Sequence, residues 1–532
     1  MMKWLQDAVF YEIYPQSFYD ANGDGIGDLI GIIEKLDYIK ELGCNALWIN
    51  PFYDSPFKDA GYDVRDYKKV AARYGTDEDA VRLFEEAHKR GIKVLIDLVP
   101  GHTSEEHEWF KESSKAEKNE YSDRYIWSDF IFNGIEGHPY IGGEAERDGV
   151  YMLNFFKCQP ALNYGWLTPT EPWQKGIDDP ACLATRKAMA DVMRFWLEKG
   201  CDGFRVDMAD SLVKEDDENK SGTCRIYRDI LPGLWHDFPH AAFVSEWNNP
   251  DQAINGAGFD MDFYLNHPGN GVNSLFRDYI TEGEDRSFFR ADGHGDIMKF
   301  LEEYQPRYNK TMMSGYISLI TCNHDTPRLT KTLTKREIEL AYAFIFTMPG
   351  VPFLYYGDEI GMKYREDLPT KEGGYFRTGS RTPMQWNSGK NLGFSEADAA
   401  DLYLPVDDAP DAPNVEDAMK DPDSLYHTVK DLIALRHANK DLQANTYCEV
   451  IYAEKEKFPF IYKRGSFIMV LNPSRETMTN IIPAGFEKVY GIGDIEALPV
   501  DESDVLKVGP QSFAVFKATT EKAREAAIAW KQ

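Results

Sequence analysis

The first hundred residues alternate short apolar runs with longer segments of helical periodicity. Residues 9–14, 46–50 and 94–99 are apolar runs that predict strands. Residues 32–42 and 77–90 repeat apolar positions every three or four residues and predict helices. Strands separated by helical segments indicate right-handed βαβ units and hence a parallel sheet.

This alternation is interrupted once and then continues. Residues 103–168 are rich in aromatic and turn-forming residues without a clear period, so we expect an inserted subdomain here rather than a structureless loop. A helix at 186–199 then leads into a strand at 203–208. Further strands are predicted at 242–246, 260–264, 316–322 and 350–356, with a helix at 335–346. Eight strands in repeated βα order predict an α/β fold, a closed (β/α)₈ TIM barrel with functional residues at the C-terminal strand ends.

The last third of the chain has a different character. Residues 363–425 are acidic and rich in Pro, Gly and Asp, which predicts a long loop over the barrel mouth before a closing helix at 426–437. Alternating short strands after residue 445 predict a small antiparallel domain, and 521–530 predicts a short helix. The predicted division is a barrel at 1–102 and 169–444, subdomain B at 103–168, a C-terminal β-sandwich at 445–519 and a helical tail at 520–532.

Composition indicates a soluble globular protein with more than one domain. The chain has 532 residues, of which 43% are hydrophobic and 28% charged, and this length exceeds one compact core. Its formal net charge of −29 disfavours nucleic acid or an anionic membrane as partner and is compatible with a neutral sugar. We expect a monomer or homodimer.

Cysteine usage and the apolar runs bear on location. The seven cysteines are scattered, odd in number and without a CxxC pair, which favours reduced thiols over disulfides or a zinc site. Residues 1–7 lack the apolar run of a signal peptide, and no run of about 18 apolar residues could span a bilayer. A cytoplasmic protein is therefore expected.

The stretch 203–208 is the first candidate for chemistry. Side chains alternate along a strand, so Arg205 and Asp207 share one face. A guanidinium beside a carboxylate keeps it ionised and oriented, as a nucleophile toward a sugar carbon must be. The plainer alternative is an ion pair at the end of an α/β sheet.

Acidic residues also stand at the ends of other predicted strands, at Asp97, Glu246 and Asp325. A retaining glycosidase needs two carboxyl groups about 5–5.5 Å apart, one as nucleophile and one as acid/base. Asp207 and Glu246 follow the neighbouring fourth and fifth strands, which makes this separation reachable. Negative charge nearby and partial burial are expected to raise the pKa of Glu246 and keep it protonated, although an acid at a helix N-terminus is the alternative.

Four blocks carry a family resemblance: Asp97 to His102, residues 203–207, residues 245–247 and residues 323–325. In order, spacing and barrel position they resemble the blocks of the α-amylase family of retaining glycoside hydrolases and transferases. The resemblance implies Asp207 as nucleophile, Glu246 as acid/base and Asp325 as a carboxylate that binds sugar hydroxyls. It also implies that Arg205, His102 and His324, which lie in these blocks, contact the substrate. Arg381, at the start of a separate motif at residues 381–386, is expected to contact the substrate as well.

Other stretches resemble the oligo-1,6-glucosidase and α-glucosidase branch, namely 61–64, 159–163, 381–386, 414–416 and 421–424. This resemblance implies that Asp63 and Arg377 pair to close the pocket around a non-reducing glucose. It further implies that Tyr62 stacks beneath the sugar and that Phe155 and Gln159 form one wall. Four positions depart from the pattern of the branch, and they put bond preference in doubt: Gly101, Ala161, Thr378 and Met208.

Residues 20–28 form a loop with oxygen-bearing side chains at every second position and glycines between them. This pattern suits the hard-oxygen ligation of Ca²⁺, although Gly31 stands where an EF-hand would place its glutamate. The resemblance to the metal loop of the family implies a structural calcium. Its implied ligands are Asp20, Asn22, Asp24, the Ile26 carbonyl and Asp28. Mg²⁺, with stricter octahedral geometry, and an acidic turn without metal are the alternatives.

Together these features predict an α-glucosidase-like hydrolase that binds a small oligosaccharide and cleaves its α-glucosidic bonds by double displacement. A transglucosidase or a trehalose synthase-like isomerase would use the same glycosyl-enzyme intermediate. A third hypothesis is an amylase that forms maltooligosaccharides or cleaves within a polymer. Amino-acid transporter heavy chains resemble the same family, but they have a membrane span and can lose the catalytic acids.

Overall fold

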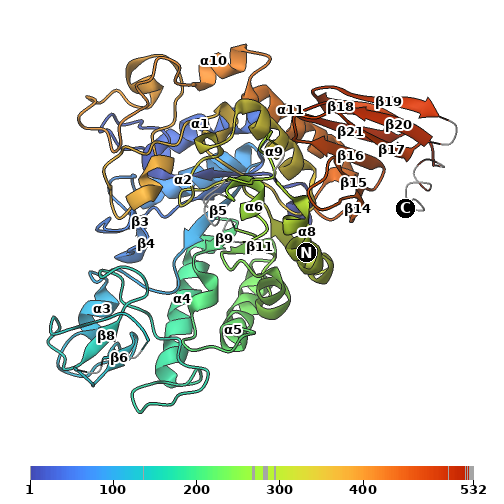
Figure 1. Cartoon of the computed structure of the whole chain (residues 1–532). Helices are drawn as coiled ribbons and strands as arrows, with labels where there is room; N and C mark the ends of the chain where they lie inside the picture. Colours follow the sequence, from blue (N-terminus) through green and yellow to red (C-terminus); the bar gives the residue numbers. More distant parts are fainter. Residues whose placement is uncertain are drawn as a thin grey trace.

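The computed structural model describes residues 2–132, 134–135, 137–265, 270–278, 285–292, 295–500, 503–521, 523 and 525. Within them an eight-stranded parallel sheet has the strand order β12-β11-β10-β9-β5-β2-β1-β13. A parallel bridge between Ile320 and Phe353 joins the two edges and closes the barrel. The predicted TIM barrel is therefore confirmed, and Figure 1 shows it at the centre of the molecule.

The barrel strands coincide with the eight apolar runs of the sequence. They are β1 (Phe10–Ile13), β2 (Ala46–Ile49), β5 (Lys93–Leu98), β9 (Gly203–Val206), β10 (Ala242–Ser245), β11 (Met261–Phe263), β12 (Tyr316–Ser318) and β13 (Phe353–Tyr355). The first position of β9 requires a glycine, Gly203, because a Cβ there would lie 1.8 Å from the Ala242 carbonyl oxygen. Most are shorter than predicted, and the residues just beyond their C-terminal ends build the site.

Alternation along the strands separates two cores. One face of the strands fills the barrel interior with side chains such as Phe10, Trp48 and Phe263, and the other face packs against the surrounding helices. Toward the C-terminal end the interior becomes polar, since Asp97 on β5 and Arg205 on β9 are fully buried there and pair in register. A charged layer thus lies directly beneath the mouth of the barrel.

Helices surround the strands and begin at clear capping signals. Thr76 and Asp79 form a capping box for α2, and Asp28 caps α1 through the Gly31 amide. α4 begins at Pro180 rather than at residue 186, because Asp179 accepts from the Ala181 amide and proline suits the first helical turn. The bounds are α1 (Leu29–Leu42), α2 (Asp77–Lys89), α4 (Pro180–Glu198), α5 (Ser221–Asp237), α6 (Asn273–Phe276), α8 (Ile297–Thr311), α9 (Lys335–Thr347), α10 (Val415–Lys420) and α11 (Leu425–Ala438).

The segment after β5 leaves the barrel, as predicted for an inserted subdomain. It contains α3 (Glu108–Ser113) and a small antiparallel sheet of β6 (Trp127–Ser128), β8 (Val150–Met152) and β7 (Tyr140–Gly142). A short hairpin, β3 (Tyr53–Asp54) with β4 (Asp66–Val70), lies between β2 and α2. Figure 1 shows α3, β6 and β8 together at one side of the barrel.

The C-terminal part is antiparallel, as predicted, and lies at the opposite end of the molecule in Figure 1. A five-stranded sheet and a three-stranded sheet share one hydrophobic core, which includes Val470 from the first and Leu506 from the second. The strands are β14 (Cys448–Tyr452), β15 (Phe460–Arg464), β16 (Phe467–Asn472), β17 (Met478–Pro483), β18 (Phe486–Ile492), β19 (Ile495–Val500), β20 (Ser503–Val508) and β21 (Ser512–Ala518). The helix predicted at 521–530 falls largely outside the described residues, and the predicted domain boundaries stay predictions.

Candidate active site

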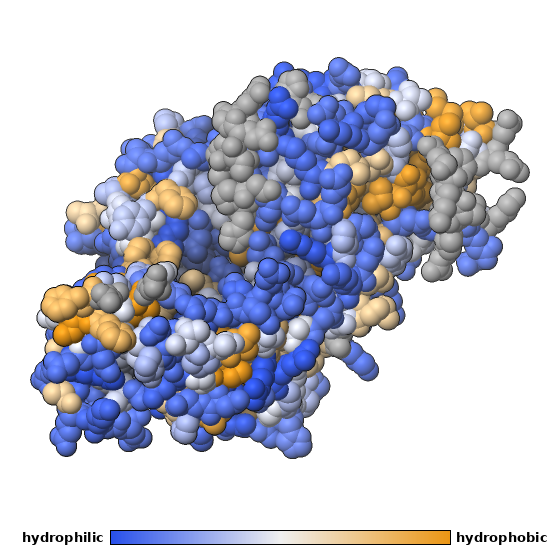
Figure 2. Space-filling model, turned by 60° about the horizontal axis from the view of Figure 1, so that its bottom comes forward, coloured by the Kyte–Doolittle hydropathy of each residue, from blue (hydrophilic) through white to orange (hydrophobic). Residues whose placement is uncertain are grey.

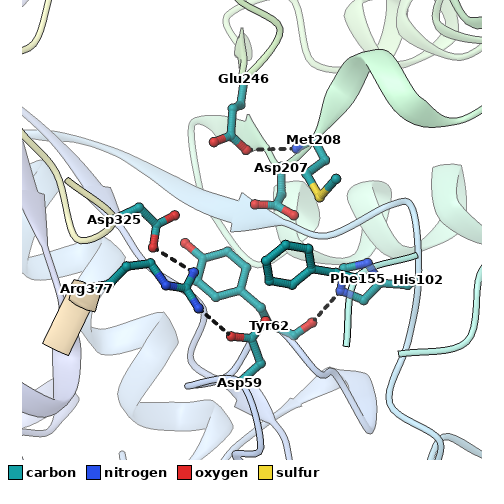
Figure 3. Close-up of a pocket in the computed structure, with 9 residues that line it drawn as sticks. All are labelled: Asp59, Tyr62, His102, Phe155, Asp207, Met208, Glu246, Asp325 and Arg377. Carbon is teal, nitrogen blue, oxygen red and sulfur yellow. Dashed lines mark hydrogen bonds and ion pairs between the residues drawn. The ribbon is translucent and has the colours of Figure 1, made fainter. Parts of the chain in front are cut away.

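Most residues predicted to carry chemistry meet around one pocket at the C-terminal ends of the barrel strands. The pocket has a volume of about 180 Å³. Figure 3 shows the residues that line it: Asp59, Tyr62, His102, Phe155, Asp207, Met208, Glu246, Asp325 and Arg377. Asp207 directly follows β9 and Glu246 directly follows β10, while the others come from longer loops and from the insert. The face of the molecule in Figure 2 is largely hydrophilic and is hollowed toward its left side.

Arg205 holds the central acids together beneath the pocket. Its Nη1 donates to Asp97 Oδ1 at 2.8 Å and to Asp207 Oδ1 at 2.7 Å. Its Nη2 lies 2.8 Å from Glu246 Oε2. Asp207 and Glu246 therefore bind the same guanidinium, which fixes both side chains near each other. The predicted pairing of Arg205 with Asp207 is confirmed, but Arg205 is 1% exposed and lies behind the lining residues rather than among them.

Burial shifts the ionisation of this cluster toward neutral pH. Burial raises the pKa of Glu246 to about 7, reinforced by the Asp207 carboxylate and opposed by Arg205. The pKa of Asp207 is likewise raised to about 7 by burial and by Asp97, again opposed by Arg205. One cation faces three carboxyl groups, so the cluster retains a proton near neutral pH. Direct contacts with the Arg205 guanidinium favour the ionised forms of both Asp207 and Glu246.

Asp325 has the opposite electrostatic environment. Arg381 Nη2 donates to its Oδ1 at 2.7 Å, and Arg377 Nη1 donates to the same oxygen at 3.1 Å. Burial disfavours the charged carboxylate, but His324 and the two arginines outweigh it and lower the pKa of Asp325 well below its usual range. Arg381, 1% exposed, therefore acts on the pocket through Asp325 and is not itself a lining residue.

The expected pair of Asp63 with Arg377 is wrong, and Asp59 takes the place of Asp63. Asp63 turns back onto its own loop, where its carboxylate accepts from the amides of Lys58 and Asp59 and from Ser55 Oγ at 2.9–3.0 Å. Asp59 lines the pocket instead, and its Oδ1 lies 3.4 Å from Arg377 Nη2. Figure 3 shows Arg377 between Asp59 and Asp325.

The physical reason for this exchange lies in the turn between the two aspartates. Ala60 has a φ of 50° and Gly61 a φ of 103°, so the chain reverses direction there and presents the two carboxylates to different surroundings. A pair of aspartates on either side of an Ala-Gly-Tyr turn was the available sequence signal. Sequence alone could not say which of them faces the pocket.

Gln159 also lies behind the pocket wall rather than in it. Its Nε2 donates to Asp59 Oδ2 at 2.7 Å, and its Oε1 accepts from the Phe156 amide at 2.7 Å. Gln159 is fully buried and so orients Asp59 instead of facing the cavity. Phe155, which is half exposed, forms the wall as predicted.

Tyr62 and the two predicted histidines form the base and one side of the site. Tyr62 lines the pocket, and its hydroxyl contacts Asp97 Oδ2 at 3.1 Å and His324 Nε2 at 2.8 Å. His324 stacks on the Tyr62 ring at 5.4 Å, is fully buried and does not line the cavity. His102 does line it, and Figure 3 shows it among the lining residues.

Met208 occupies the turn after the nucleophile candidate. It has a φ of 41°, an unusual backbone conformation for a long side chain. This turn aims the Met208 amide at Glu246 Oε2, at 2.9 Å, and places the Met208 side chain in the pocket lining. The departure noted at this position thus lies next to the proposed acid.

The residues of the predicted calcium loop have the right donor chemistry but are engaged with the loop itself. Asp20 accepts from the amides of Gly23 and Gly25 at 2.7 Å, and Asp28 accepts from the amides of Ala21 and Gly31. Asn22 and Asp24 accept from amides two residues further on. Within the described part of the chain, no three histidine, cysteine or carboxylate side chains converge as a metal site would require.

Comparison with known proteins identifies the class to which this fold and site belong. The family model described as "Alpha amylase, catalytic domain" matches residues 12–445, so the chain belongs to the α-amylase family. It is 34% identical over 449 residues to the trehalose synthase/amylase TreS of Mycolicibacterium smegmatis, covering 76% of this chain and 70% of that protein. It is 33% identical to an oligo-1,6-glucosidase of Parageobacillus thermoglucosidasius in an alignment that covers 97% of this chain and 99% of that protein.

Solved structures agree with this assignment. The chain is similar to a variant of trehalulose synthase MutB in complex with Tris, with a TM-score of 0.77 and 27% identity over 97% of this chain and 100% of that one. It is also similar to a variant of isomaltulose synthase from Erwinia rhapontici NX5 in complex with sucrose, with a TM-score of 0.78 and 26% identity over 97% and 99%. The proteins similar to this chain thus include oligo-1,6-glucosidases and synthases of trehalose, trehalulose and isomaltulose.

Proposed function

We propose that this protein is a retaining α-glucosidase that cleaves short α-linked glucosides from the non-reducing end. The observation that carries the proposal is that Asp207 and Glu246 face one small pocket and contact the same Arg205 guanidinium. Such close carboxyl groups are compatible with the roughly 5–5.5 Å separation of retaining enzymes. The oligo-1,6-glucosidases among the relatives support this substrate class.

The roles of Glu246 and Asp207 are those that the family resemblance implies. Glu246, with its pKa raised to about 7 mainly by burial, donates a proton to the glycosidic oxygen as the bond to the sugar breaks. Asp207 attacks the anomeric carbon and forms a glycosyl ester. Glu246 then takes a proton from a water molecule as that water attacks the anomeric carbon, the bond from this carbon to Asp207 breaks, and both acids return to their starting states. Asp325, held ionised by its two arginines, accepts bonds from sugar hydroxyls.

The pocket shape supports exo-acting cleavage of short substrates. Arg377 lies between Asp59 and Asp325 and closes one side of a cavity of only about 180 Å³. A single sugar ring with its leaving group at the open side suits this volume better than the middle of a polymer. Tyr62 forms the base on which that ring rests.

A second function uses the same intermediate and transfers the glucosyl group to a sugar instead of water. The trehalose synthase/amylase relatives and the trehalulose and isomaltulose synthase structures favour this alternative. Met208, whose amide bonds to Glu246, and Phe155 both line the pocket, where apolar side chains can hold an acceptor sugar and reduce access of water. An amylase producing maltooligosaccharides is the remaining alternative.

Product analysis separates these activities. The purified enzyme is incubated with maltose, isomaltose, trehalose, sucrose and longer maltooligosaccharides, and the products are resolved by anion-exchange chromatography. Glucose as the main product from maltose or isomaltose supports the hydrolase. Isomeric disaccharides as the main products would favour the isomerase, and mixed oligosaccharides from soluble starch would favour an amylase.

Metal, location and assembly complete the proposal. The oxygen donors of residues 20–28 fit a structural calcium, with Mg²⁺ as the alternative ion. A cytoplasmic location is supported by seven buried cysteines that all remain free thiols in the described chain. No described helix is both long and apolar enough to cross a membrane. A monomer or homodimer is expected, which light scattering during gel filtration measures.

A further inference from the structure

Asn154 of the insert lies between a lining residue of the pocket and a buried lysine. Its Nδ2 contacts His102 Nδ1 at 2.9 Å. Its Oδ1 accepts from Lys214 Nζ at 3.1 Å, and the same Nζ donates to the Ser211 carbonyl at 2.8 Å. His102 Nε2 in turn lies 3.1 Å from the Tyr62 carbonyl oxygen, as Figure 3 shows. A continuous chain of polar contacts therefore joins the barrel, the insert and the pocket wall.

The absence of a side chain at position 101 makes room for this arrangement. A Cβ on Gly101 would lie 3.0 Å from Asn154 Nδ2 and 3.8 Å from Ser211 Oγ. Gly101 has no left-handed backbone that would itself demand glycine. The amide of Asn154 thus occupies the space next to His102 that a side chain at 101 would otherwise fill.

We propose that Asn154 is a positioning residue for the sugar site, which fixes the orientation of His102 and of the adjoining pocket wall. This inference rests on the proposed function and deepens it by assigning a residue that acts on sugar affinity without touching the sugar. On the barrel side, Lys214 holds Asn154 through a hydrogen bond to its Oδ1. Because Gly101 has no side chain, the Asn154 amide has room to reach His102.

Hydrogen-bond chemistry determines what Asn154 does to His102. An amide NH₂ can only donate, so Nδ1 of His102 must accept and the ring proton must reside on Nε2. That proton then faces the Tyr62 carbonyl oxygen. Burial lowers the pKa of His102 to about 4, so the ring is neutral and this single tautomer persists at neutral pH. His102, Tyr62 and Phe155, the neighbour of Asn154 in the chain, all line the pocket.

Lys214 holds the other end of the Asn154 amide. Lys214 is 7% exposed, and its ammonium has no carboxylate within ion-pairing distance among the described residues. Two carbonyl-type oxygens, from Asn154 and Ser211, satisfy it instead. Its backbone amide also bonds to the Gly165 carbonyl at 3.1 Å, where the insert returns to the barrel. Lys214 therefore attaches the insert to the barrel at two points, Asn154 and Gly165.

An aspartate at position 154 tests positioning separately from stability. Asn154→Asp keeps the shape of the side chain and gains an ion pair with Lys214, but its carboxylate only accepts, so the proton of the neutral His102 ring moves to Nδ1 and the bond from Nε2 to the Tyr62 carbonyl is lost. We expect its melting temperature to equal or exceed that of the wild type. We also expect a KM about tenfold higher for the preferred disaccharide and about tenfold weaker binding of 1-deoxynojirimycin, with kcat changed less, as loss of one hydrogen bond implies.

Matched variants control for general damage to the insert. Asn119→Ala removes an amide that donates to the Glu112 carbonyl in the same insert, away from the pocket, and leaves both constants unchanged. Asn154→Ala weakens binding like the aspartate. Adding Gly101→Asn to Asn154→Ala supplies an amide from the other side and restores most of the affinity, because truncation at 154 vacates the space.

Three results would overturn the inference: wild-type affinity in Asn154→Asp, equal weakening in Asn119→Ala, or no recovery in the double variant. Calorimetric binding of 1-deoxynojirimycin decides it even if Asn154→Ala does not fold, since the aspartate variant retains its anchor. A wild-type enzyme that neither cleaves nor transfers from any α-glucoside would instead contradict the proposed function. An active wild type beside an unchanged aspartate variant contradicts only the role of Asn154.

Discussion

The exchange of Asp63 for Asp59 leads to a pair of isosteric substitutions with opposite expected effects. Asp59→Asn removes the negative charge that faces Arg377 in the pocket, whereas Asp63→Asn changes a carboxylate that bonds only to its own loop. Both variants keep side-chain volume. A difference between them therefore reports on placement rather than size.

The structure sets the magnitude for each. Asp59 loses a charge-assisted contact in a buried site, and such a bond contributes about 1.5–3 kcal/mol, so kcat/KM should fall roughly 10- to 150-fold. In Asp63→Asn the side-chain oxygen still accepts from the Asp59 amide, but the acceptor for the Lys58 amide is lost. This should lower the free energy of unfolding by about 1 kcal/mol and change kcat/KM less than about threefold.

The pH dependence sharpens the test. Burial raises the pKa of Asp59 to about 7 against the opposing charge of Arg377, so the wild-type carboxylate is ionised above this pH and protonated below it. Asparagine resembles the protonated form. The ratio of wild-type to Asp59→Asn kcat/KM should therefore shrink as the pH falls through about 7. Initial rates on the preferred disaccharide between pH 5 and 8.5 measure kcat/KM and its pH dependence. Thermal melts of both variants measure the change in stability. A silent Asp59→Asn beside an impaired Asp63→Asn would refute the placement.

Three further predictions follow from the same pocket and loop. Because Glu246 must be protonated and its pKa is raised to about 7, wild-type kcat/KM should fall as the pH rises above about 7. Glu246→Gln should abolish this decrease and lower the rate on disaccharides at least about 100-fold, whereas a wild-type kcat/KM that stays constant at alkaline pH would contradict the role of Glu246. Met208→Ala should change the ratio of maltose to isomaltose cleavage at least about threefold, since the side chain lines the pocket beside Glu246, and an unchanged ratio would remove Met208 from specificity. Calcium at 100 times its Kd should stabilise the protein by about 2.7 kcal/mol, measured as a rise in melting temperature that a chelator reverses. Asp24→Ala should abolish this rise, and an equal rise in that variant would show that the ion binds elsewhere.

Hydrophobic alternation was sufficient to predict the barrel. Each strand has buried positions on both faces, and strands such as β5 and β9 stand out as apolar runs bounded by turns. The position of Asp207 and Glu246 at neighbouring strand ends followed from that periodicity alone. Their convergence is a consequence of parallel strands having their C-terminal ends at one edge.

Other parts of the site depend on contacts that no local pattern contains. Asp59 and Asp63 are alike in sequence, and only the left-handed turn at Ala60 and Gly61 sends them to different neighbours. Gln159 meets Asp59 across a separation of 100 residues, and Asn154 meets His102 across 52. Such pairings depend on how the insert folds back over the barrel, which apolar periodicity does not encode.

The central claim is that Asp207 becomes covalently bonded to the sugar during turnover. Incubation with 5-fluoro-α-glucosyl fluoride, followed by mass spectrometry of the intact protein and of its peptides, measures this directly. The account predicts one fluoroglucosyl adduct per chain, located on Asp207. An adduct on a different carboxylate, or full turnover of the probe through an inverted product without any adduct, would contradict it.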